Sequence, residues 1–346
     1  VYTYYLAALF ALFGAGALTE IVRVTLTSAV SALRCALAPL FALDAGLGSM
    51  TAGIAGILSV FYIPALETEM KGSTDGAWVS LVLLAIVWIS LRIWRSSSWR
   101  SSTPWWFFAL FGFAALLDPV VLPVVAAFVI AGAIARPTGS FKRYLREAVL
   151  LSLTIFLFLV PWAVRNDIVL NKLIWTKSNF GLEFWMSNGP GRAFDLATNM
   201  GDPNLHPSNS YAEAQKVATL GEVKYNRQKL AEAMSWVRAN PEDFLHLTLR
   251  RFIAWWFPPG PNIIIQTAKL CLSLLAFAGL FLLVRRRVLA GWLFLLTWIT
   301  LPDVYYVLQW SSRYRFPMEW ELLICASAAL ATAYAALHGF THKKTT

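Results

Sequence analysis

Long apolar runs, separated by short polar stretches, dominate the pattern of this chain. A helix that spans the hydrocarbon core of a bilayer needs about 20 predominantly apolar residues. By that criterion the pattern predicts membrane helices over Ile21–Leu43, Met50–Leu66, Gly76–Ile93, Ala148–Val164, Ile263–Val284, Val288–Leu301 and Pro317–Leu337. The expected fold class is an all-α polytopic membrane protein, a bundle of about eight or nine transmembrane or half-length helices with a soluble insertion on its outer face.

Two further apolar runs, Trp105–Leu117 and Val120–Ile134, are separated only by Asp118-Pro119. Together they are too short for two complete crossings. We therefore expect a hairpin of half-length helices that neighbouring helices shield from lipid. The run Tyr4–Leu18 is also short, and we interpret it as a segment that lies in the membrane interface.

Residues 165–251 form the longest polar region of the sequence. Its first part is rich in Gly, Pro and Asn and predicts loops, whereas the pattern from about Tyr211 to Ala239 is helical. The segment Asn240-Pro241-Glu242-Asp243 predicts the start of another helix, with Asn at the N-cap and Pro at the first position. The expected organisation is an N-terminal membrane bundle over 1–164, a polar region over 165–251, and C-terminal membrane helices with a tail over 252–346.

Composition supports the membrane class. Of the 346 residues, 58% are apolar and only 14% are charged, and the mean hydropathy is +0.58. Soluble globular chains are about 45–50% apolar and about 25% charged. A water-soluble globular domain and a disordered chain are therefore both excluded. The 16 Trp and 23 Phe suit the aromatic belts of a membrane protein.

The net charge of +10 is concentrated in short loops between apolar runs. These basic clusters lie at Arg92–Arg100, Arg136–Arg146, Arg285–Arg287 and Lys343-Lys344. Short basic loops face the cytoplasm according to the positive-inside rule, so they argue against nucleic acid as a partner. The rule then places residues 165–251, residues 302–316 and the acidic loop Glu67–Asp75 on the extracytoplasmic side of the inner cell membrane.

Motifs of soluble enzymes are absent from the sequence: there is no P-loop, dinucleotide-binding glycine motif, H-E-x-x-H or G-x-S-x-G. The three cysteines, Cys35, Cys271 and Cys325, all lie inside apolar runs. They offer neither a disulfide framework nor a Cys-based metal site. We expect neither a metal nor a cofactor.

Charged residues at membrane ends are candidate functional groups. Glu67 and Glu69 are either a solvated helix end or carboxylates that face an active site. Asp118 is either a polar turn cap or part of a buried network. Arg313 and Arg315 are suited to bidentate binding of a lipid phosphate, although general anchoring at the interface explains them equally well.

Several short motifs, taken in order, resemble those of a known family. They are Leu9–Gly14 followed by Arg23, Leu66–Glu69, Leu117-Asp118-Pro119, Pro161–Asn166, Gly181–Pro190, Asn240-Pro241, Arg250–Trp256 and Arg313–Pro317. Their order and spacing resemble the GT-C glycosyltransferases of the bacterial protein-O-mannosyltransferase and aminoarabinose-transferase type. The resemblance implies an integral membrane enzyme that moves a sugar from a polyprenyl-phosphate carrier to a lipid, glycan or protein acceptor at the outer face.

The family carries its catalytic acidic residue, usually in an Asp-Glu pair, in the first outer loop. The resemblance implies that this loop precedes Val1, so we expect an N-terminally truncated chain. Glu69 or Glu67 would then be a second acidic group in the catalytic pocket, with Asp75 as the alternative. The resemblance further implies that the primary carboxylate deprotonates or orients the acceptor hydroxyl.

The resemblance also implies roles for residues that bind the substrate. Arg313 and Arg315, together with Arg165, would stabilise the negative charge of the leaving phosphate. Asn188 and Gly189 would shape the outer loop, or would serve simply as turn residues. The expected partners are the lipid-linked sugar donor, its acceptor and membrane lipids.

Two alternative interpretations of the function stay open. A polytopic transporter or flippase of lipid-linked glycans would predict paired inverted repeats, and the sequence shows none. A non-catalytic membrane scaffold or pseudoenzyme would predict that substitution of Arg313, Arg315 and Glu69 has no effect on the phenotype.

Overall fold

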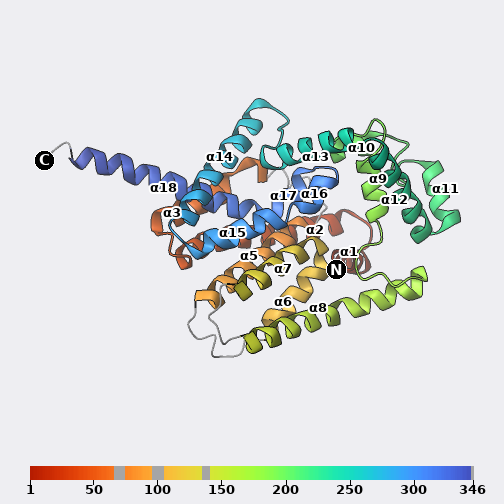
Figure 1. The fold of residues 1–346 in the computed structure, drawn as a ribbon, viewed down its shortest axis with the longest axis horizontal. Coiled ribbons are helices and arrows are strands. Elements are labelled where there is room, and N and C mark those ends of the chain that lie inside the picture. The colour runs from red at the N-terminus through yellow and green to blue at the C-terminus, as the bar shows by residue number, and fades with distance from the viewer. Residues whose placement is uncertain (66–74, 96–104, 135–140, 344–346) are drawn as a thin grey trace.

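The computed structural model describes residues 1–65, 75–95, 105–134 and 141–343 of the chain (Figure 1). Within these ranges it contains helices and one isolated β-bridge, and no strand. Five segments among the described residues are long and apolar enough to cross a membrane. They are α2 (Ala17–Asp44), α5 (Gly76–Arg95), residues Leu145–Leu170 of α8 (Phe141–Leu170), α14 (Ile263–Arg285), and Ser312–His338, which combines α17 (Ser312–Arg315), η2 (Phe316–Met318) and most of α18 (Glu319–Lys343). The protein is an all-α polytopic membrane protein, as the hydrophobic pattern predicts.

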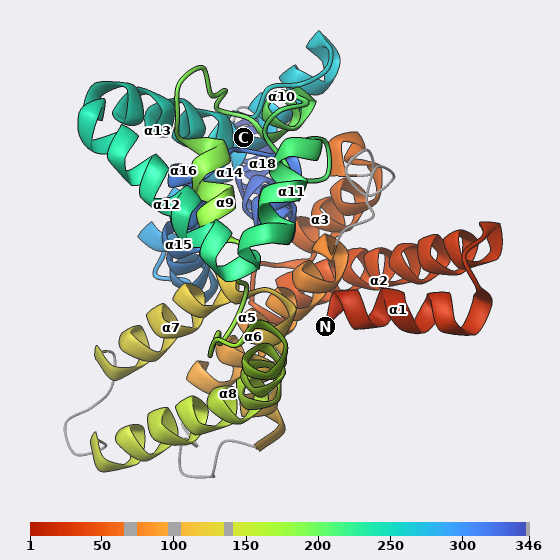
Figure 2. The same ribbon diagram turned by 90° about the vertical axis from the view of Figure 1, so that its right-hand side faces the viewer.

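Shorter apolar helices complete the bundle. They are α1 (Tyr2–Phe13), α3 (Ser49–Phe61), α6 (Trp105–Leu117), α7 (Leu122–Ile134) and α15 (Leu289–Thr300). The predicted hairpin of half-length helices is present, because α6 and α7 have 13 residues each. Asp118 begins the intervening 3-10 turn η1 (Pro119–Val121), where its carboxylate accepts a hydrogen bond from the amide of Val120. Figure 2 shows α1 and the first part of α2 projecting together from one side of the bundle.

The polar region folds into four helices, which we call the polar lobe. These are α9 (Phe180–Ser187), α10 (Leu196–Gly201), α11 (Tyr211–Leu220) and α12 (Glu222–Ala239), and α13 (Pro241–Trp256) leads from them back to the bundle (Figure 1). The predicted start of α13 at Asn240-Pro241 is confirmed. The Asn240 side chain does not bond to the first turn of α13, however, but donates a hydrogen bond to the carbonyl of Trp236 at 2.9 Å.

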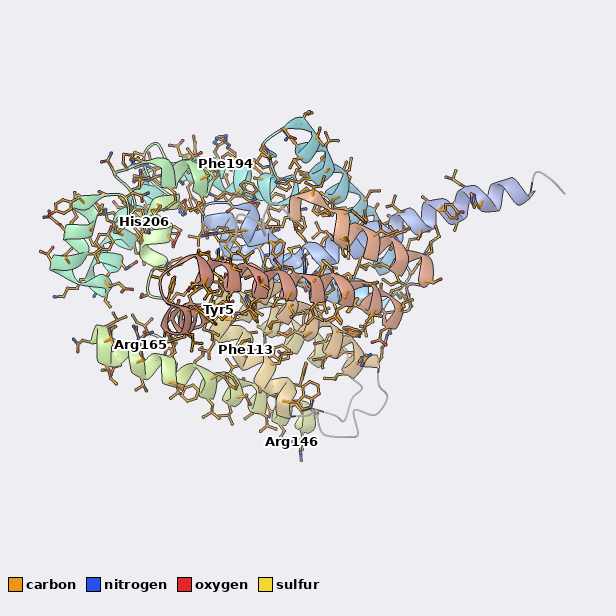
Figure 3. All side chains as sticks on the ribbon, turned by 180° about the vertical axis from the view of Figure 1, so that it is seen from behind. Tyr5, Phe113, Arg146, Arg165, Phe194 and His206 are labelled. Carbon is orange, nitrogen blue, oxygen red and sulfur yellow. The ribbon has the colours of Figure 1, made fainter. Side chains whose placement is uncertain are left out.

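The two ends of the bundle differ in charge. The last turns of α5, the first turns of α8 and the C-terminus lie at the end opposite the polar lobe (Figure 1). Arg92 and Arg95 occupy the last turn of α5. Figure 3 shows Arg146 near that basic end of α8 and Arg165 at the other end, beside the polar lobe. Helix α8 runs without interruption through residue 164, where the sequence predicted a domain boundary.

The first half of α18 is buried within the bundle, where the helix packs against α14, α3 and α2, and its second half projects from the bundle (Figure 1). Its Trp320 ring contacts the rings of Phe41 and Phe294 edge-on, with centroids 5.3 and 5.6 Å apart. Gly279 of α14 lies directly against the backbone of α18, where an added Cβ would overlap the carbonyl oxygen of Cys325. Only glycine fits there, as is common where membrane helices pack through small residues.

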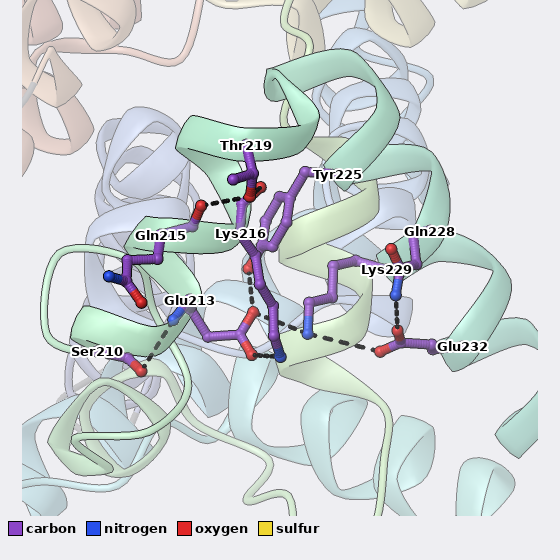
Figure 4. A network of polar contacts seen from close by, with 9 residues as sticks. All are labelled: Ser210, Glu213, Gln215, Lys216, Thr219, Tyr225, Gln228, Lys229 and Glu232. Atoms are coloured by element: carbon purple, nitrogen blue, oxygen red, sulfur yellow. Dashed lines mark hydrogen bonds and ion pairs between the residues drawn. The ribbon is translucent and has the colours of Figure 1, made fainter.

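A buried charged cluster holds the polar lobe together (Figure 4). Glu213 of α11 forms ion pairs with Lys216 at 2.8 Å and with Lys229 of α12 at 2.9 Å, and it accepts a hydrogen bond from the Tyr225 hydroxyl at 2.7 Å. Burial alone would raise the pKa of Glu213, but these three donors lower it to about 2. The Lys229 ammonium also lies 3.5 Å from the ring centre of Trp185, which ties α9 to the same cluster.

Residues 302–316 pack against the polar lobe, although α13, α14 and α15 lie between the two in sequence. Trp310 donates a backbone hydrogen bond to Phe194 and accepts one from Leu196, both at 2.8 Å. The two long polar segments that the basic clusters place on one side of the membrane therefore meet in space.

Candidate active site

A cavity of about 690 Å³ opens at the lobe end of the bundle. Its walls come from the starts of α1, α5, η1 and α7, the ends of α6 and α8, residues 175–183, and residues 303–317. The charged side chains that line it are Asp75, Asp118, Glu183, Asp303, Lys177 and Arg313. Ligand pockets in proteins have volumes of about 300–1,000 Å³ and carry a few convergent polar groups. This cavity is therefore the candidate active site.

Two carboxyl groups meet a lysine on one side of the cavity. Lys177 forms an ion pair with Asp118, with 3.1 Å between Nζ and Oδ1. Asp75 lies immediately before α5 and faces the same charges. Burial, followed by the negative charge of Asp118, raises the pKa of Asp75 above its usual range, and Lys177 opposes this rise only in part. A carboxyl group whose pKa is raised is better suited than an ordinary aspartate to accept a proton from a substrate hydroxyl.

Glu183 is fixed by two amide side chains. Asn179 donates to its Oε1 at 3.2 Å and Gln309 donates to its Oε2 at 3.1 Å. These bonds connect α9 with residues 302–316, so the acidic group keeps its place in the cavity wall. Each Glu183 oxygen retains further capacity to accept hydrogen bonds from a ligand.

Arg313 supplies a second positive charge to the cavity, close enough to Asp75 to interact with it electrostatically. Its guanidinium donates to the hydroxyl of Tyr314 at 3.0 Å and is exposed to the cavity. The Tyr314 ring stacks on Tyr305 with centroids 4.4 Å apart, and Tyr305 stacks in turn on Trp255 at 5.4 Å. This aromatic column gives Arg313 a rigid support, and its planar guanidinium can bind a phosphate through two parallel hydrogen bonds.

Apolar residues line the part of the cavity that faces the membrane helices. Leu116, Val120 and Pro123 come from the α6–α7 hairpin, and Leu159 and Trp162 come from α8. The cavity lining thus combines charged side chains with apolar side chains from the membrane helices. Such a lining fits an amphiphilic substrate with a charged or polar head and an apolar tail.

The structure separates the two arginines that the sequence grouped together. Arg315 points away from the cavity and is completely buried, where it donates to the carbonyls of Trp255 at 2.9 Å and Trp256 at 3.1 Å and to Ser273 at 3.2 Å. It also lies 3.7 Å from the carboxylate of Glu319. Arg315 holds the bundle to α13 and does not line the cavity.

The other predicted substrate-binding residues do not line the cavity either. Arg165 is exposed and donates to the neighbouring Asn166 at 3.0 Å, while its guanidinium lies over the ring of Trp162. Asn188 is fully buried, donates to the Val307 carbonyl at 3.0 Å and accepts from Arg251 at 3.0 Å. It joins the end of α9 to residues 302–316.

Gly189 follows Asn188 in the same turn, and a Cβ there would lie 3.4 Å from Nε of Arg192. Glu67 and Glu69 lie outside the described residues. Asp75, which was the alternative to them, lines the cavity.

Sequence reasoning missed Lys177, Glu183 and Tyr305 as cavity residues. Lys177 and Glu183 belong to a mixed-charge region in which nothing distinguishes them from solvated side chains. Asp118 was considered as a polar turn cap or as part of a buried network. It caps η1, and its ion-pair partner Lys177 is mostly exposed. One signal in the sequence could have indicated part of the cavity. Asp75, Asp118 and Arg313 all lie at ends of predicted membrane helices, and the basic clusters assign these ends to the same side of the membrane.

Among the described residues, no group of three His, Cys, Asp or Glu side chains lies close enough together to hold a metal ion. Comparison of the chain with family models, curated proteins and solved structures finds no match.

Proposed function

We propose that the protein is an integral membrane glycosyltransferase that moves a sugar from a polyprenyl-phosphate carrier to an acceptor hydroxyl. The observation that carries this proposal is the composition of the cavity. A shielded carboxyl group, Asp75, and an arginine on a rigid aromatic support, Arg313, line one cavity that continues between apolar walls. The ordered motifs that resemble GT-C glycosyltransferases point to the same chemistry.

In the proposed reaction the acceptor oxygen attacks the anomeric carbon of the sugar. The new bond joins the acceptor oxygen to that carbon, and the bond from the carbon to the phosphate oxygen breaks. The acceptor proton passes to a carboxylate, and Asp75 is the described residue best suited to take it. Arg313 stabilises the negative charge that the leaving polyprenyl phosphate gains, which is electrostatic catalysis by a positioned donor.

We further propose that the lobe end faces the extracytoplasmic side of the inner cell membrane. Arg92 and Arg95 lie at the opposite end of the bundle, and short basic segments face the cytoplasm. The lipid tail of the donor then runs along the apolar walls formed by α6, η1 and α8. The sugar and phosphate lie beside Asp75, Lys177 and Arg313.

The test is a transfer assay with the full-length gene product in lipid vesicles, supplied with polyprenyl-phosphate sugars and with lipid, glycan or peptide acceptors. We expect covalent transfer, reduced by Arg313→Ala about 10²–10³-fold, the usual loss when one electrostatic donor is removed. The matched control is Arg238→Ala, because Arg238 is an exposed arginine of α12 outside the cavity. Movement of the lipid across the bilayer without a covalent product would favour the transporter, and equal rates for the two variants would remove Arg313 from the mechanism.

A further inference from the structure

Helix α13 presents three different faces along its length. At about 100° per residue, Leu245, Leu249, Phe252 and Ile253 fall on one arc of the helix surface. Their side chains are 67%, 53%, 45% and 49% exposed. Four large apolar side chains exposed side by side are unusual on a helix that is surrounded by water. Large exposed apolar patches on proteins usually mark contact surfaces.

The other two faces of α13 are accounted for. Leu247, Arg251 and Trp255 form the buried face. Arg251 donates from Nη1 to Asn188 and to the carbonyl of Val307, both at 3.0 Å, which attaches α13 to α9 and to residues 302–316. On the third face, the exposed Arg250 lies over the ring of Phe194, with 4.5 Å between its guanidinium carbon and the ring centre. This third face is polar and turns toward the segment that precedes α10.

The exposed apolar arc continues into the membrane-spanning surface. Phe257, which follows α13 directly, is 39% exposed and contacts the ring of Phe277 on α14. Ile263 and Ile264 begin α14, one of the helices long and apolar enough to cross the membrane, and are 75% and 72% exposed. The apolar surface of α13 is thus continuous with a surface that lipid covers.

We propose that α13 is an interfacial helix whose arc of Leu245, Leu249, Phe252 and Ile253 lies among the acyl chains of the leaflet at the lobe end. A helix with one apolar face in lipid and one polar face towards headgroups and water has the pattern of an interfacial amphipathic helix. The buried face, with Leu247, Arg251 and Trp255, attaches it to the protein. Such an arrangement fixes the height of the polar lobe above the membrane, and it does not depend on the chemistry carried out in the cavity.

Labelling with a fluorophore tests this placement. In the full-length protein the native cysteines are replaced (Cys35→Ala, Cys271→Ala, Cys325→Ala), and single cysteines are introduced at Leu245 and Asp243. These two residues lie at almost the same level of α13 on different faces, so they form a matched pair. Each cysteine carries a nitrobenzoxadiazole label in phosphatidylethanolamine–phosphatidylglycerol vesicles. Leu157→Cys on the exposed face of α8 gives the lipid reference, and Lys224→Cys on α12 gives the water reference.

We expect doxyl-labelled lipid to quench the label at Leu245 to the extent seen at Leu157, and iodide to quench it several-fold less than at Asp243 or Lys224. Equal iodide quenching at Leu245 and Asp243 would place the arc in water and overturn the proposal. Protection from both quenchers would mean that protein, either a second copy or a partner, covers the arc, and would overturn it too. Leu249→Cys repeats the measurement if the Leu245 variant does not fold.

Discussion

The guanidinium of Arg315 lies 2.9 Å from the backbone carbonyl oxygen of Trp255 and donates a hydrogen bond to it. Carbonyls in the last turn of a helix have no partner within that helix, and a positive charge there also interacts favourably with the helix dipole. Arg315 therefore ends α13 and attaches it to the start of α18. This relationship distinguishes a structural arginine from its neighbour Arg313, which lines the cavity.

Arg315→Ala should destabilise the protein by about 3–5 kcal/mol, because it removes a buried cation that interacts with Glu319 and with two helix-end carbonyls. Arg313→Ala should leave the unfolding midpoint near that of the wild type and lower only the rate of transfer. Thermal unfolding in detergent, followed by tryptophan fluorescence, separates the two effects. A stable Arg315→Ala protein without transfer activity would return Arg315 to the substrate-binding residues.

The raised pKa of Asp75 predicts the pH dependence of transfer. A general base must be ionised, so activity should fall on the acid side at a higher pH than for an ordinary aspartate. Removing the like charge in Asp118→Asn should lower the pKa of Asp75 and move this acid limb to lower pH. The measurement is kcat/KM against pH for the wild type and for Asp118→Asn.

Asp75→Asn should abolish the acid limb together with most of the activity. Asp167→Asn is its control, since Asp167 is an exposed aspartate near the end of α8, outside the cavity. An unchanged profile in Asp75→Asn would assign the proton transfer to another group.

The polar lobe should lose stability in acid because the folded pKa of Glu213, about 2, lies below the ordinary value of 4.5. A lowered carboxyl pKa contributes stability that is fully present above the unfolded value. That stability is lost as the pH falls from about 4.5 towards 2. Amide hydrogen exchange in α11 and α12 at pH 6 and at pH 3 measures the change.

Glu213→Gln should cost about 1.5–3 kcal/mol at pH 6, the usual contribution of hydrogen bonds to a charged group. The same substitution should also make the stability of the polar lobe depend less on pH. Glu242→Gln, at an exposed position, is the control. If the Glu213→Gln variant lost as much stability in acid as the wild type, a group other than Glu213 would be responsible for that loss.

Gly279→Ala should separate α14 from α18, since the added methyl would overlap the Cys325 carbonyl oxygen. Overpacking typically lowers the free energy of unfolding by about 1–3 kcal/mol. The Cys325 carbonyl belongs to the backbone and cannot rotate away from the methyl group as a side chain could. Gly53→Ala is the matched control in α3, where a Cβ meets nothing within 4 Å. The thermal midpoint of the Gly279 variant should fall, and that of the Gly53 variant should hold or rise because alanine favours helix.

Local signals were enough to predict parts of this fold. The α6–α7 hairpin follows from two apolar runs around Asp118-Pro119, and the start of α13 follows from Asn240-Pro241. Both depend on residues adjacent in sequence. The side chain of Asn240, by contrast, donates a hydrogen bond to the carbonyl of Trp236, which precedes it in the chain. The preference of Asn for the N-cap position does not predict this bond.

The candidate site could be predicted only in part, because its residues come from six separated segments. Arg313 and Arg315 were grouped as one phosphate-binding pair on the assumption that residues 302–316 are a loop. They lie in the short helix α17, where residues two apart point in directions about 200° apart. One arginine faces the cavity and the other faces the core. Asn188 looked like part of an exposed turn, and only the distant Arg251 and Val307 explain its burial.

The central position of α18 has a consequence for biosynthesis. Helices α2, α3 and α14 precede α18 in the chain and pack against it. During synthesis these helices enter the bilayer with faces such as that of Phe41 unpaired until α18 follows them. A stop codon before residue 312 therefore removes a helix from the interior of the bundle rather than from its edge.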